Sequence, residues 1–421
     1  MHGANAPGAG VREDPVPEAR ERRQFAALAE QVAHAMRAAP AFAELLAGVD
    51  PAAVTDRAAL ARLPVIRKSE LMERQKGGPG AHRPFGGLTA VETGRLARIF
   101  ASPGPIYDPD GRRGDWWRMA RALWAAGFRR GDVVHNCFSY HFTPAGMMLE
   151  TGAQEIGCAV VPAGVGNTEQ QVRAIVDIRP AGYVGTPSFL RIILEKGREM
   201  GADLSSMRRA LVSGEALPPA LRAEIGAAGI AVRQCYATAD LGLVAYESVP
   251  DAGLVLDEWV IVEILRPGTG DPVGPGEVGE VVVTTLNPDY PLIRFATGDL
   301  SMLLPGASPC GRTAPRLKGW MGRADQTTKV RGLFVHPSQV AEVARRHAAI
   351  GRCRLVVAGE GGNDRMELRA EVAPGARGEG LAEAIAQSIQ AVTRLRGDVA
   401  FVDPGALPND GKVIEDARTS G

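Results

Sequence analysis

Residues 209–240 read RALVSGEALPPALRAEIGAAGIAVRQCYATAD and set the expected architecture. A short apolar run ends in Ser-Gly-Glu, prolines stand where a helix would begin, and a second apolar run follows at VRQCYA. The pattern predicts strand, helix and strand, which is the repeating unit of a parallel sheet. In such sheets the loops beyond the carboxyl ends of the strands carry the ligand site.

The same alternation extends upstream. Three further short strands are expected, each followed by a helical stretch: VVHNCF (133–138), AVVPAG (159–164) and GYVGTP (182–187). One helix is expected to begin near residue 167, where Thr168 and Gln171 have the spacing of a capping box. This region therefore predicts an α/β domain built on a parallel sheet.

The flanking sequence has other periodicities. Helical apolar spacing runs from Glu18 to about Ala47 and again after Asp56, whereas EWVIVEIL, GEVVVTTL and LIRFATGDLSMLL read as hairpin strands. After them the pattern mixes short strands with two helices. We therefore expect a flexible leader at 1–17, a large N-terminal domain with a β-rich lobe at 18–322, and a small α+β C-terminal domain at 323–421.

The composition is that of a soluble globular protein. The chain has 421 residues, 45% of them hydrophobic and 23% charged, and its 48 Lys plus Arg balance 48 Asp plus Glu. Zero formal charge argues against nucleic acid as a partner, and the sequence contains no apolar run long enough for a membrane span. The first residues lack the apolar core of a signal peptide, so we expect a cytoplasmic protein. The five cysteines form no Cys-x-x-Cys pair, which disfavours a zinc ribbon.

Two neighbouring strand ends carry polar groups that could meet a nucleotide. Residues 213–215 end one strand before a helix, where free backbone amides and a carboxylate could contact a planar ligand. At the next strand end, Tyr236, Thr238 and Asp240 offer a ring, a hydroxyl and a carboxylate that could hold Mg²⁺ with phosphates. A plain strand-to-helix turn and a capping aspartate are the structural alternatives.

Charged residues interrupt two other segments. In PLIRFATGDLSML, Asp299 follows a Thr-Gly pair, and a carboxylate on such a turn could accept both hydroxyls of a ribose. Near the C-terminus, Lys412 follows Asn-Asp-Gly. Its ammonium could neutralise a carboxylate and a phosphate together if the small domain carried it to the large one. An ordinary turn and a solvated surface lysine are the alternatives.

The segment FSYHF groups ring side chains that could line a pocket for an aromatic acid. They are Phe138, Tyr140, His141 and Phe142. The alternative interpretation is that His141 is a core histidine whose ring nitrogens are hydrogen-bonded within the protein.

The order of these pieces is more informative than any one of them. Over about two thirds of the chain, that order resembles the phenylacetate-CoA ligase family of the adenylate-forming enzymes, which also include acyl-CoA synthetases, luciferases and nonribosomal adenylation domains. The matching segments are GDVVHN, PAGVGNTEQQ, GTPSFL, SGEALP, YATAD, GEVVVTTL, PLIRFATGDL, GWMGRADQ, VRGLFVHPSQV and LPNDGK. The resemblance implies the adenylate-forming fold, in which a small mobile C-terminal domain rotates against a large N-terminal one.

The resemblance also implies a two-step reaction that uses ATP, Mg²⁺ and coenzyme A. A carboxylate attacks the α-phosphorus of ATP to give an acyl-adenylate and pyrophosphate, and the CoA thiol then attacks the acyl carbon and releases AMP. The implied substrate is a small carboxylic acid, aromatic or arylacetic, such as phenylacetate. Related ligases tend to pair, so a homodimer is a candidate assembly, although the sequence does not give the oligomeric state.

Several residues take nucleotide-binding roles by this resemblance. Asp299 would hold the ribose hydroxyls, and Asp240 stands at the Mg²⁺ carboxylate position, where the family usually has Glu. Tyr236 would pack on the face of the adenine, and Ala237 and Thr238 would belong to the same cofactor-binding segment. The rest of the adenine site would be Ser213, Gly214, Glu215 and Ala216.

The small domain would supply the remaining roles. Lys412 would bridge the substrate carboxylate and the α-phosphate, and Arg323 would lie near the ribose and phosphate. Asp325 would be the hinge between the domains. Arg331 and Gly332 would form part of the CoA tunnel in the second conformation.

The phosphate loop departs from the family pattern. A loop rich in Ser, Thr and Gly is expected, but the stretch reads FASPGPIYDPDGRRGDWW. Its hydroxyls are reduced to Ser102, Pro103 and Pro105 remove two amide donors, and Arg112 and Arg113 are candidates to compensate. The leading hypothesis is a carboxylate-CoA ligase. The alternatives are an adenylating enzyme that loads a carrier protein and a degenerate member that only binds a nucleotide or acyl-CoA.

Overall fold

The computed structural model describes residues 16–77, 83–102, 106–266, 270–321, 323–324, 328–331, 333–335, 337–359, 364–408 and 412–418. The chain divides into two compact units, Met1–Met321 and Gly322–Gly421, so the division falls one residue before the expected position. Four residues named above lie outside the described residues, as does most of the expected leader. They are Pro103, Pro105, the expected hinge Asp325 and the expected tunnel residue Gly332.

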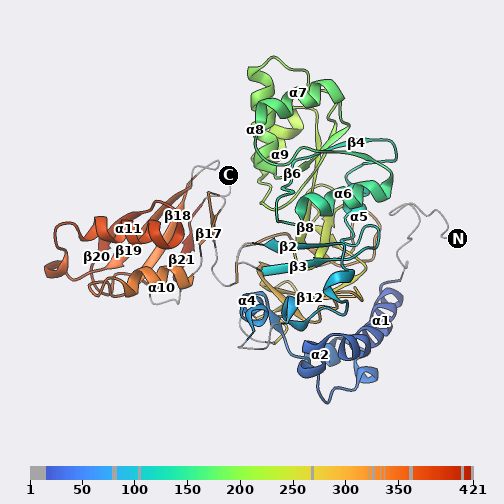
Figure 1. Ribbon diagram of the computed structural model, residues 1–421, viewed down its shortest axis with the longest axis horizontal. Coiled ribbons are helices and arrows are strands. Elements are labelled where there is room, and N and C mark those ends of the chain that lie inside the picture. The colour runs from blue at the N-terminus through green and yellow to red at the C-terminus, as the bar shows by residue number, and fades with distance from the viewer. Residues whose placement is uncertain are drawn as a thin grey trace. The chain divides into compact units, whose positions relative to one another are not determined.

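The N-terminal part of the larger unit is helical, as its apolar spacing predicts. The helices are α1 (Pro17–Ala38), α2 (Pro40–Leu45), α3 (Arg57–Ala61) and α4 (Lys68–Lys76). One side of α1 is buried at Leu28 and Val32. Its Gln31 amide donates to the carbonyls of Thr285 and Asn287, which fixes the helix against the β-rich lobe. Figure 1 shows α1 and α2 together in blue at one end of this unit.

The predicted parallel sheet is present in the larger unit. After α5 (Ala120–Ala125) come β4 (Val133–Asn136), α6 (Ala145–Ile156), β5 (Ala159–Pro162), α7 (Thr168–Ile178), β6 (Gly182–Gly185), α8 (Pro187–Glu199), β7 (Arg209–Val212), α9 (Pro219–Ala227) and β8 (Ala231–Thr238). Strands β5, β4, β6, β7 and β8 lie side by side in parallel. Prolines occupy the first turn of α8 and α9, as expected.

The sheet continues beyond β8 with antiparallel strands. These are β9 (Gly242–Glu247), β10 (Leu254–Leu256), β15 (Arg316–Leu317) and β14 (Leu303–Leu304). Among the described residues the complete order is β14-β15-β10-β9-β8-β7-β6-β4-β5. The candidate strand ends after β7 and β8 therefore lie near the middle of one large sheet.

Helix α7 begins where predicted, but the predicted capping box is wrong. Its N-cap residue is Asn167, and no described side chain caps the helix. The Gln171 amide nitrogen instead donates to the carbonyls of Gly164 and Gly166 at 2.9 and 2.8 Å, and its oxygen accepts from Cys137 Sγ at 2.9 Å. Tertiary contacts with the end of β4 therefore outweigh the local capping pattern.

The β-rich lobe contains the predicted hairpins and one unpredicted strand. The predicted strands are β11 (Val260–Leu265), β12 (Gly279–Thr285) and β13 (Phe295–Ser301), which pair antiparallel in sequence order. The unpredicted strand β1 (Ile66–Arg67) pairs in parallel with β13 and precedes α4 directly. The start of α4 therefore lies beside the strand that carries Asp299.

An antiparallel hairpin lies where the phosphate loop is expected. Its strands are β2 (Arg98–Ser102) and β3 (Ile106–Asp110). Side chains alternate between its two faces, so that Ser102 and Asp108 are buried whereas Ile99 and Tyr107 are exposed. The Ser102 hydroxyl donates to the Ile106 carbonyl at 3.3 Å. The remaining hydroxyl of the loop is thus used within the hairpin.

The smaller unit is an α+β body with its own core. Its elements are β16 (Thr328–Val330), β17 (Leu333–Val335), α10 (Pro337–Arg345), β18 (Cys353–Ala358), β19 (Arg365–Glu371), α11 (Leu381–Thr393), β20 (Asp398–Val402) and β21 (Ile414–Asp416). Strand β21, which was not predicted, pairs in parallel with β18. Leu355, Leu368 and Ile385 lie in the buried core between sheet and helices. In the described parts of both units, none of the helices has the length and apolarity needed to cross a membrane.

Candidate nucleotide site

The strand ends after β7 and β8 are adjacent, as the parallel pattern predicts. Val212 pairs with Gln234, and the Ser213 hydroxyl donates to the Cys235 carbonyl at 2.8 Å. Gly214 follows with a φ of 80°, a backbone conformation that favours glycine. Residues 214–216 are exposed, so this edge is open to a ligand.

Glu215 and Phe138 lie close to the same edge. The Glu215 carboxylate accepts from the Ser188 hydroxyl at 2.6 Å. A Cβ added at Gly214 would lie 3.8 Å from both the Phe138 ring and the Thr186 methyl group, which is ordinary van der Waals contact. The edge predicted to bind adenine therefore adjoins one residue of the predicted acid pocket.

Tyr236 joins this edge to the β-rich lobe. Its hydroxyl donates to Asp299 Oδ2 at 2.8 Å and lies 3.2 Å from Thr297 Oγ1. The other oxygen of Asp299 accepts from the Trp320 indole nitrogen at 3.1 Å. A shallow pocket beside Asp299 is lined by Tyr236, Trp320, Val281, Leu300 and Gly319, among others. Trp320 is 48% exposed, so a hydrogen-bond donor to Asp299 comes from a residue on the surface.

Asp240 follows the same strand but is buried. Its side chain has no exposed surface, and Lys68 Nζ lies 2.5 Å from its Oδ2. Asp108, on the inward face of the β2–β3 hairpin, is a close neighbour. Burial, with the Asp240 carboxylate, raises the pKa of Asp108 well above its usual range, although Lys68 opposes the shift. Sequence reasoning gave no role to Lys68 or Asp108.

Asp240 does not fit a magnesium ligand in this structure. Mg²⁺ requires near-octahedral coordination by oxygens at about 2.0–2.1 Å and retains several waters. The Asp240 carboxylate is enclosed, and an ammonium group already lies against it. In the described part of the chain, no cluster of three His, Cys, Asp or Glu side chains could hold a metal.

The predicted acid-pocket residues differ in exposure. Phe138 is 8% exposed, whereas Phe142 is 66% exposed and His141 lies beside it, with ring centroids 4.9 Å apart. The Tyr140 hydroxyl accepts from the Asn136 amide at 2.7 Å, and burial raises the pKa of Tyr140. The structure therefore buries Phe138, leaves Tyr140 partly buried and leaves the other two rings on the surface of the larger unit.

Comparison with known proteins identifies the family. A family model described as AMP-binding enzyme matches residues 115–287. The phenylacetate-coenzyme A ligase of Thermus thermophilus is 32% identical over 381 residues, which cover 85% of this chain and 84% of that protein. The chain belongs to the phenylacetate-coenzyme A ligase family. The Escherichia coli phenylacetate-coenzyme A ligase is 32% identical over 312 residues, covering 70% of this chain and 69% of that protein.

The fold agrees with this family assignment. The crystal structure of 2-hydroxyisobutyryl-CoA ligase, in complex with 2-HIB-AMP and CoA, matches with a TM-score of 0.80 at 25% identity. The match covers 97% of this chain and 92% of that chain. The adenylate-forming fold predicted from the sequence is thereby confirmed.

The family residues expected in the smaller unit differ in exposure. Lys412 is exposed, and its carbonyl accepts from Arg354 Nε at 3.2 Å just before β21. Arg323 is partly buried. Arg331 is exposed, with its backbone nitrogen and Nε donating to Asp364 at 2.9 Å.

Arg112 and Arg113 follow β3, at the end of the hairpin away from its turn. Arg112 Nε donates to the Arg95 carbonyl at 3.1 Å, and Arg113 donates to Asn287 Oδ1 at 2.6 Å. Both guanidinium groups therefore have contacts within the larger unit, and their proposed compensation for the altered loop stays a prediction.

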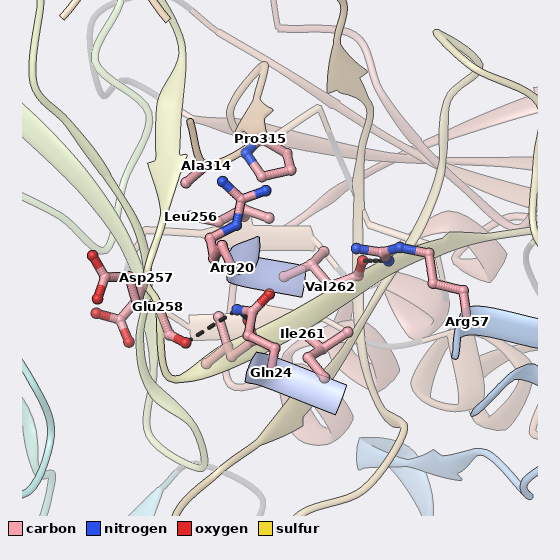
Figure 2. A pocket seen from close by; sticks show the side chains of 11 residues that line it. Arg20, Gln24, Arg57, Leu256, Asp257, Glu258, Ile261, Val262, Ala314 and Pro315 are labelled. Carbon is pink, nitrogen blue, oxygen red and sulfur yellow. Dashed lines mark hydrogen bonds between the residues drawn. The ribbon is translucent and has the colours of Figure 1, made fainter. Parts of the chain in front are cut away.

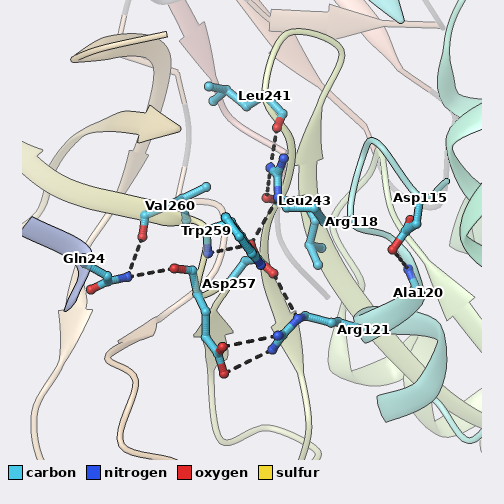
Figure 3. Close-up of polar contacts among 11 residues, drawn as sticks. Gln24, Asp115, Arg118, Ala120, Arg121, Leu241, Leu243, Asp257, Trp259 and Val260 are labelled. Carbon is cyan, nitrogen blue, oxygen red and sulfur yellow. Dashed lines mark hydrogen bonds and ion pairs between the residues drawn. The ribbon is translucent and has the colours of Figure 1, made fainter. Parts of the chain in front are cut away.

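Arg118 holds the backbone that follows Asp240. Its guanidinium donates to the carbonyls of Leu241 and Leu243 at 2.6 and 2.9 Å and pairs with Asp257 at 3.1 Å (Figure 3). Asp257 is fully buried, and the Arg121 guanidinium lies 3.8 Å from its second oxygen. This network fixes the turn from β8 to β9 and with it the position of Asp240.

A separate cavity lies between α1 and β11 (Figure 2). Its volume of about 10 Å³ admits at most one water molecule. Arg20, Gln24 and Arg57 line it, and Gln24 and Arg57 donate to backbone carbonyls of the lobe. This cavity belongs to the packing of the N-terminal helix and is too small for a nucleotide.

Proposed function

We propose that this protein is an AMP-forming carboxylate-CoA ligase that acts on an aromatic or arylacetic acid, with phenylacetate as the reference substrate. The observation that carries the proposal is the hydrogen bond between Tyr236 and Asp299, next to the exposed edge at residues 214–216, in a chain of this family. A ring and a carboxylate in that relation can receive an adenine face and a pair of ribose hydroxyls.

In the first half-reaction the acid's carboxylate oxygen attacks the α-phosphorus of ATP, which enters as its magnesium complex. A P–O bond forms to the acid, and the bond to pyrophosphate breaks. Lys412 neutralises the approaching anions, and Arg323 lies at the ribose and phosphate. Lys412 is exposed in the smaller unit, as a residue delivered by domain movement must be.

In the second half-reaction the thiol of CoA attacks the acyl carbon and AMP leaves. Rotation about Asp325 brings Arg331 and Gly332 to the pantetheine tunnel in this proposal. Arg331 carries its charge on an exposed turn between β16 and β17, where it can approach a second surface. The alternation explains why Lys412 would serve the first half-reaction alone.

The aromatic class of acid rests on Phe138 and Tyr140. Phe138 contacts the strand edge beside Gly214, so a ring bound against it would place its carboxylate near the nucleotide. His141 and Phe142 are exposed on the same segment and form the outer part of the proposed acid pocket.

The test is AMP release from ATP and Mg²⁺ with benzoic, phenylacetic, indoleacetic and short aliphatic acids, with and without CoA. We expect AMP formation that requires both an aromatic acid and CoA. It should fall by about two orders of magnitude or more in Lys412→Ala, because charge neutralisation at the reacting centre is lost. Lys196→Ala, which removes an exposed lysine from α8, is the matched control. Hydrolysis of ATP that ignores acid and CoA would overturn the proposal.

A second candidate is a family member that binds a nucleotide or acyl-CoA without turnover. The β2–β3 hairpin favours it, because Ser102 is buried and its hydroxyl is used internally. AMP binding with no turnover of any acid would establish this alternative. Turnover with a carrier protein but none with free CoA would instead indicate carrier loading. Light scattering at assay concentrations tests the proposed homodimer.

A further inference from the structure

The ion pair between Lys68 and Asp240 joins segments that are far apart in the sequence. Lys68 begins α4 directly after β1, which β13 holds in place, and Asp240 ends the β8 turn that Arg118 fixes. The two side chains meet at 2.5 Å, with 27% of the Lys68 side chain and none of the Asp240 side chain exposed. The ammonium therefore closes the solvent side of an otherwise enclosed carboxylate.

Two further buried polar groups, Asp108 and Tyr290, lie near this pair, and Asp108 interacts with Ser102, Asp240 and Lys68. Both oxygens of Asp108, Oδ1 of Asp240 and the hydroxyl of Tyr290 are buried. Asp108 and Tyr290 are 0% and 1% exposed. The cluster thus contains two carboxyl groups and one ammonium in an enclosed space. Among the described residues, Lys68 is the cation recorded beside these carboxyl groups, so removing its ammonium would leave them without that compensating charge.

The cluster lies where the proposed site would bind the phosphates of ATP. Asp108 lies on the inward face of the hairpin that stands at the phosphate loop, and Asp240 follows the strand of the proposed adenine site. An ATP-dependent enzyme needs positive charge at this position, because the negatively charged triphosphate oxygens would otherwise be repelled by the carboxylates of Asp108 and Asp240. A lysine ammonium is a compact point charge that can meet this need without waters of coordination.

We propose that Lys68 is a built-in cation that takes the place of a divalent metal at Asp240. This inference rests on the proposed function. Magnesium enters only with ATP, and Asp240 is not its ligand. Binding of AMP, which carries no pyrophosphate, is therefore independent of magnesium, and the fold around Asp240 depends on Lys68 instead.

The experiment compares melting temperature and calorimetric AMP binding in millimolar MgCl₂ and in EDTA with KCl at equal ionic strength. For the wild type we expect no difference in either quantity. Lys68→Met should melt several degrees lower than the wild type in EDTA. Mg²⁺ should restore part of the lost melting temperature by binding where the Lys68 ammonium was. Lys76→Met, on the same helix with a 58% exposed side chain, should behave as the wild type.

Two results would overturn the inference. One is a wild type whose melting temperature or AMP affinity rises in Mg²⁺ and loses that response in Asp240→Asn. The other is a Lys68→Met variant that is as stable as the wild type in EDTA. If Lys68→Met does not fold, the wild type and Asp240→Asn still decide the question. Failure of AMP to bind under every condition would sink the proposed function, whereas the melting temperatures would still test the role of Lys68.

Discussion

Arg294 offers a sharp test of how the β-rich lobe is held together. Its side chain is 1% exposed, and its five N–H groups have five acceptors. Nε and Nη2 donate to the two oxygens of Glu263 at 3.0 and 3.1 Å. The other three donate to the carbonyls of Ala61, Leu63 and Gly270 at 2.8, 2.5 and 2.9 Å. One side chain thus joins the end of α3 to two segments of the lobe.

Replacing Arg294 with methionine should lower the free energy of unfolding by about 3–5 kcal/mol, the usual cost of leaving a buried charge without its partner. Burial already raises the pKa of Glu263, and Arg294 opposes that shift. Glu263→Gln alone should also be costly, because it leaves the guanidinium unpaired. The double variant should lose less than the sum of the two, by about 2 kcal/mol, because neither charge is then stranded.

Urea unfolding followed by tryptophan fluorescence measures these values, since all five tryptophans belong to the larger unit. The control is Arg173→Met, which breaks an exposed pair with Glu169 and should cost less than about 1 kcal/mol. A loss below about 1 kcal/mol for Arg294→Met would refute the reasoning. So would strict additivity in the double variant.

Two other predictions concern single side chains. Burial lowers the pKa of His135, whose Nε2 is 2.9 Å from Gln171 Oε1, so the folded state resists protonation. The free energy of unfolding should therefore fall as the pH drops below about 6.5, the pKa of histidine in the unfolded chain. His135→Asn should make the free energy of unfolding less dependent on pH when it is measured from neutral to acidic pH. Trp320→Phe removes the indole donor to Asp299, so AMP no longer has to displace it. The affinity of the variant for AMP, measured by calorimetry, should rise by up to about tenfold, because one hydrogen bond contributes about 1 kcal/mol. Weaker AMP binding in the variant would show instead that Trp320 assists the nucleotide.

The parallel sheet could be predicted because its signal is local. Each strand is a short apolar run, and all but the last end at or beside Gly, Pro or Ser. The observed ends at Val212 and Thr238 lie within a few residues of the expected ones. Gln171 shows where local pattern fails. Its spacing from Thr168 suits a capping box, yet burial against β4 gives the amide better partners. Buried polar groups are nearly always hydrogen-bonded, and Gln171 here supplies a partner to Cys137 and to two loop carbonyls.

The charged cluster could not be predicted for a different reason. Lys68 and Asp240 are 172 positions apart, and the strand that brings Lys68 into place is two residues long. A two-residue strand has no periodicity to detect, because alternation needs about four residues to register. Asp108 carried a weak signal, since it alternates with an exposed tyrosine in IYDPD, but its inward direction depends on the register with β2.

The two halves of the proposed nucleotide site have therefore diverged differently from the family pattern. The half that would meet adenosine keeps an aromatic ring, a carboxylate and an exposed glycine edge, and these groups already contact one another through Tyr236 and Asp299. The half that would meet phosphate has a hairpin with an internally bonded serine, and beneath it an ammonium paired with a buried carboxylate. Adenosine recognition requires hydrogen bonds and stacking, which tolerate no substitute, whereas phosphate recognition requires positive charge, which a lysine can supply in place of a metal.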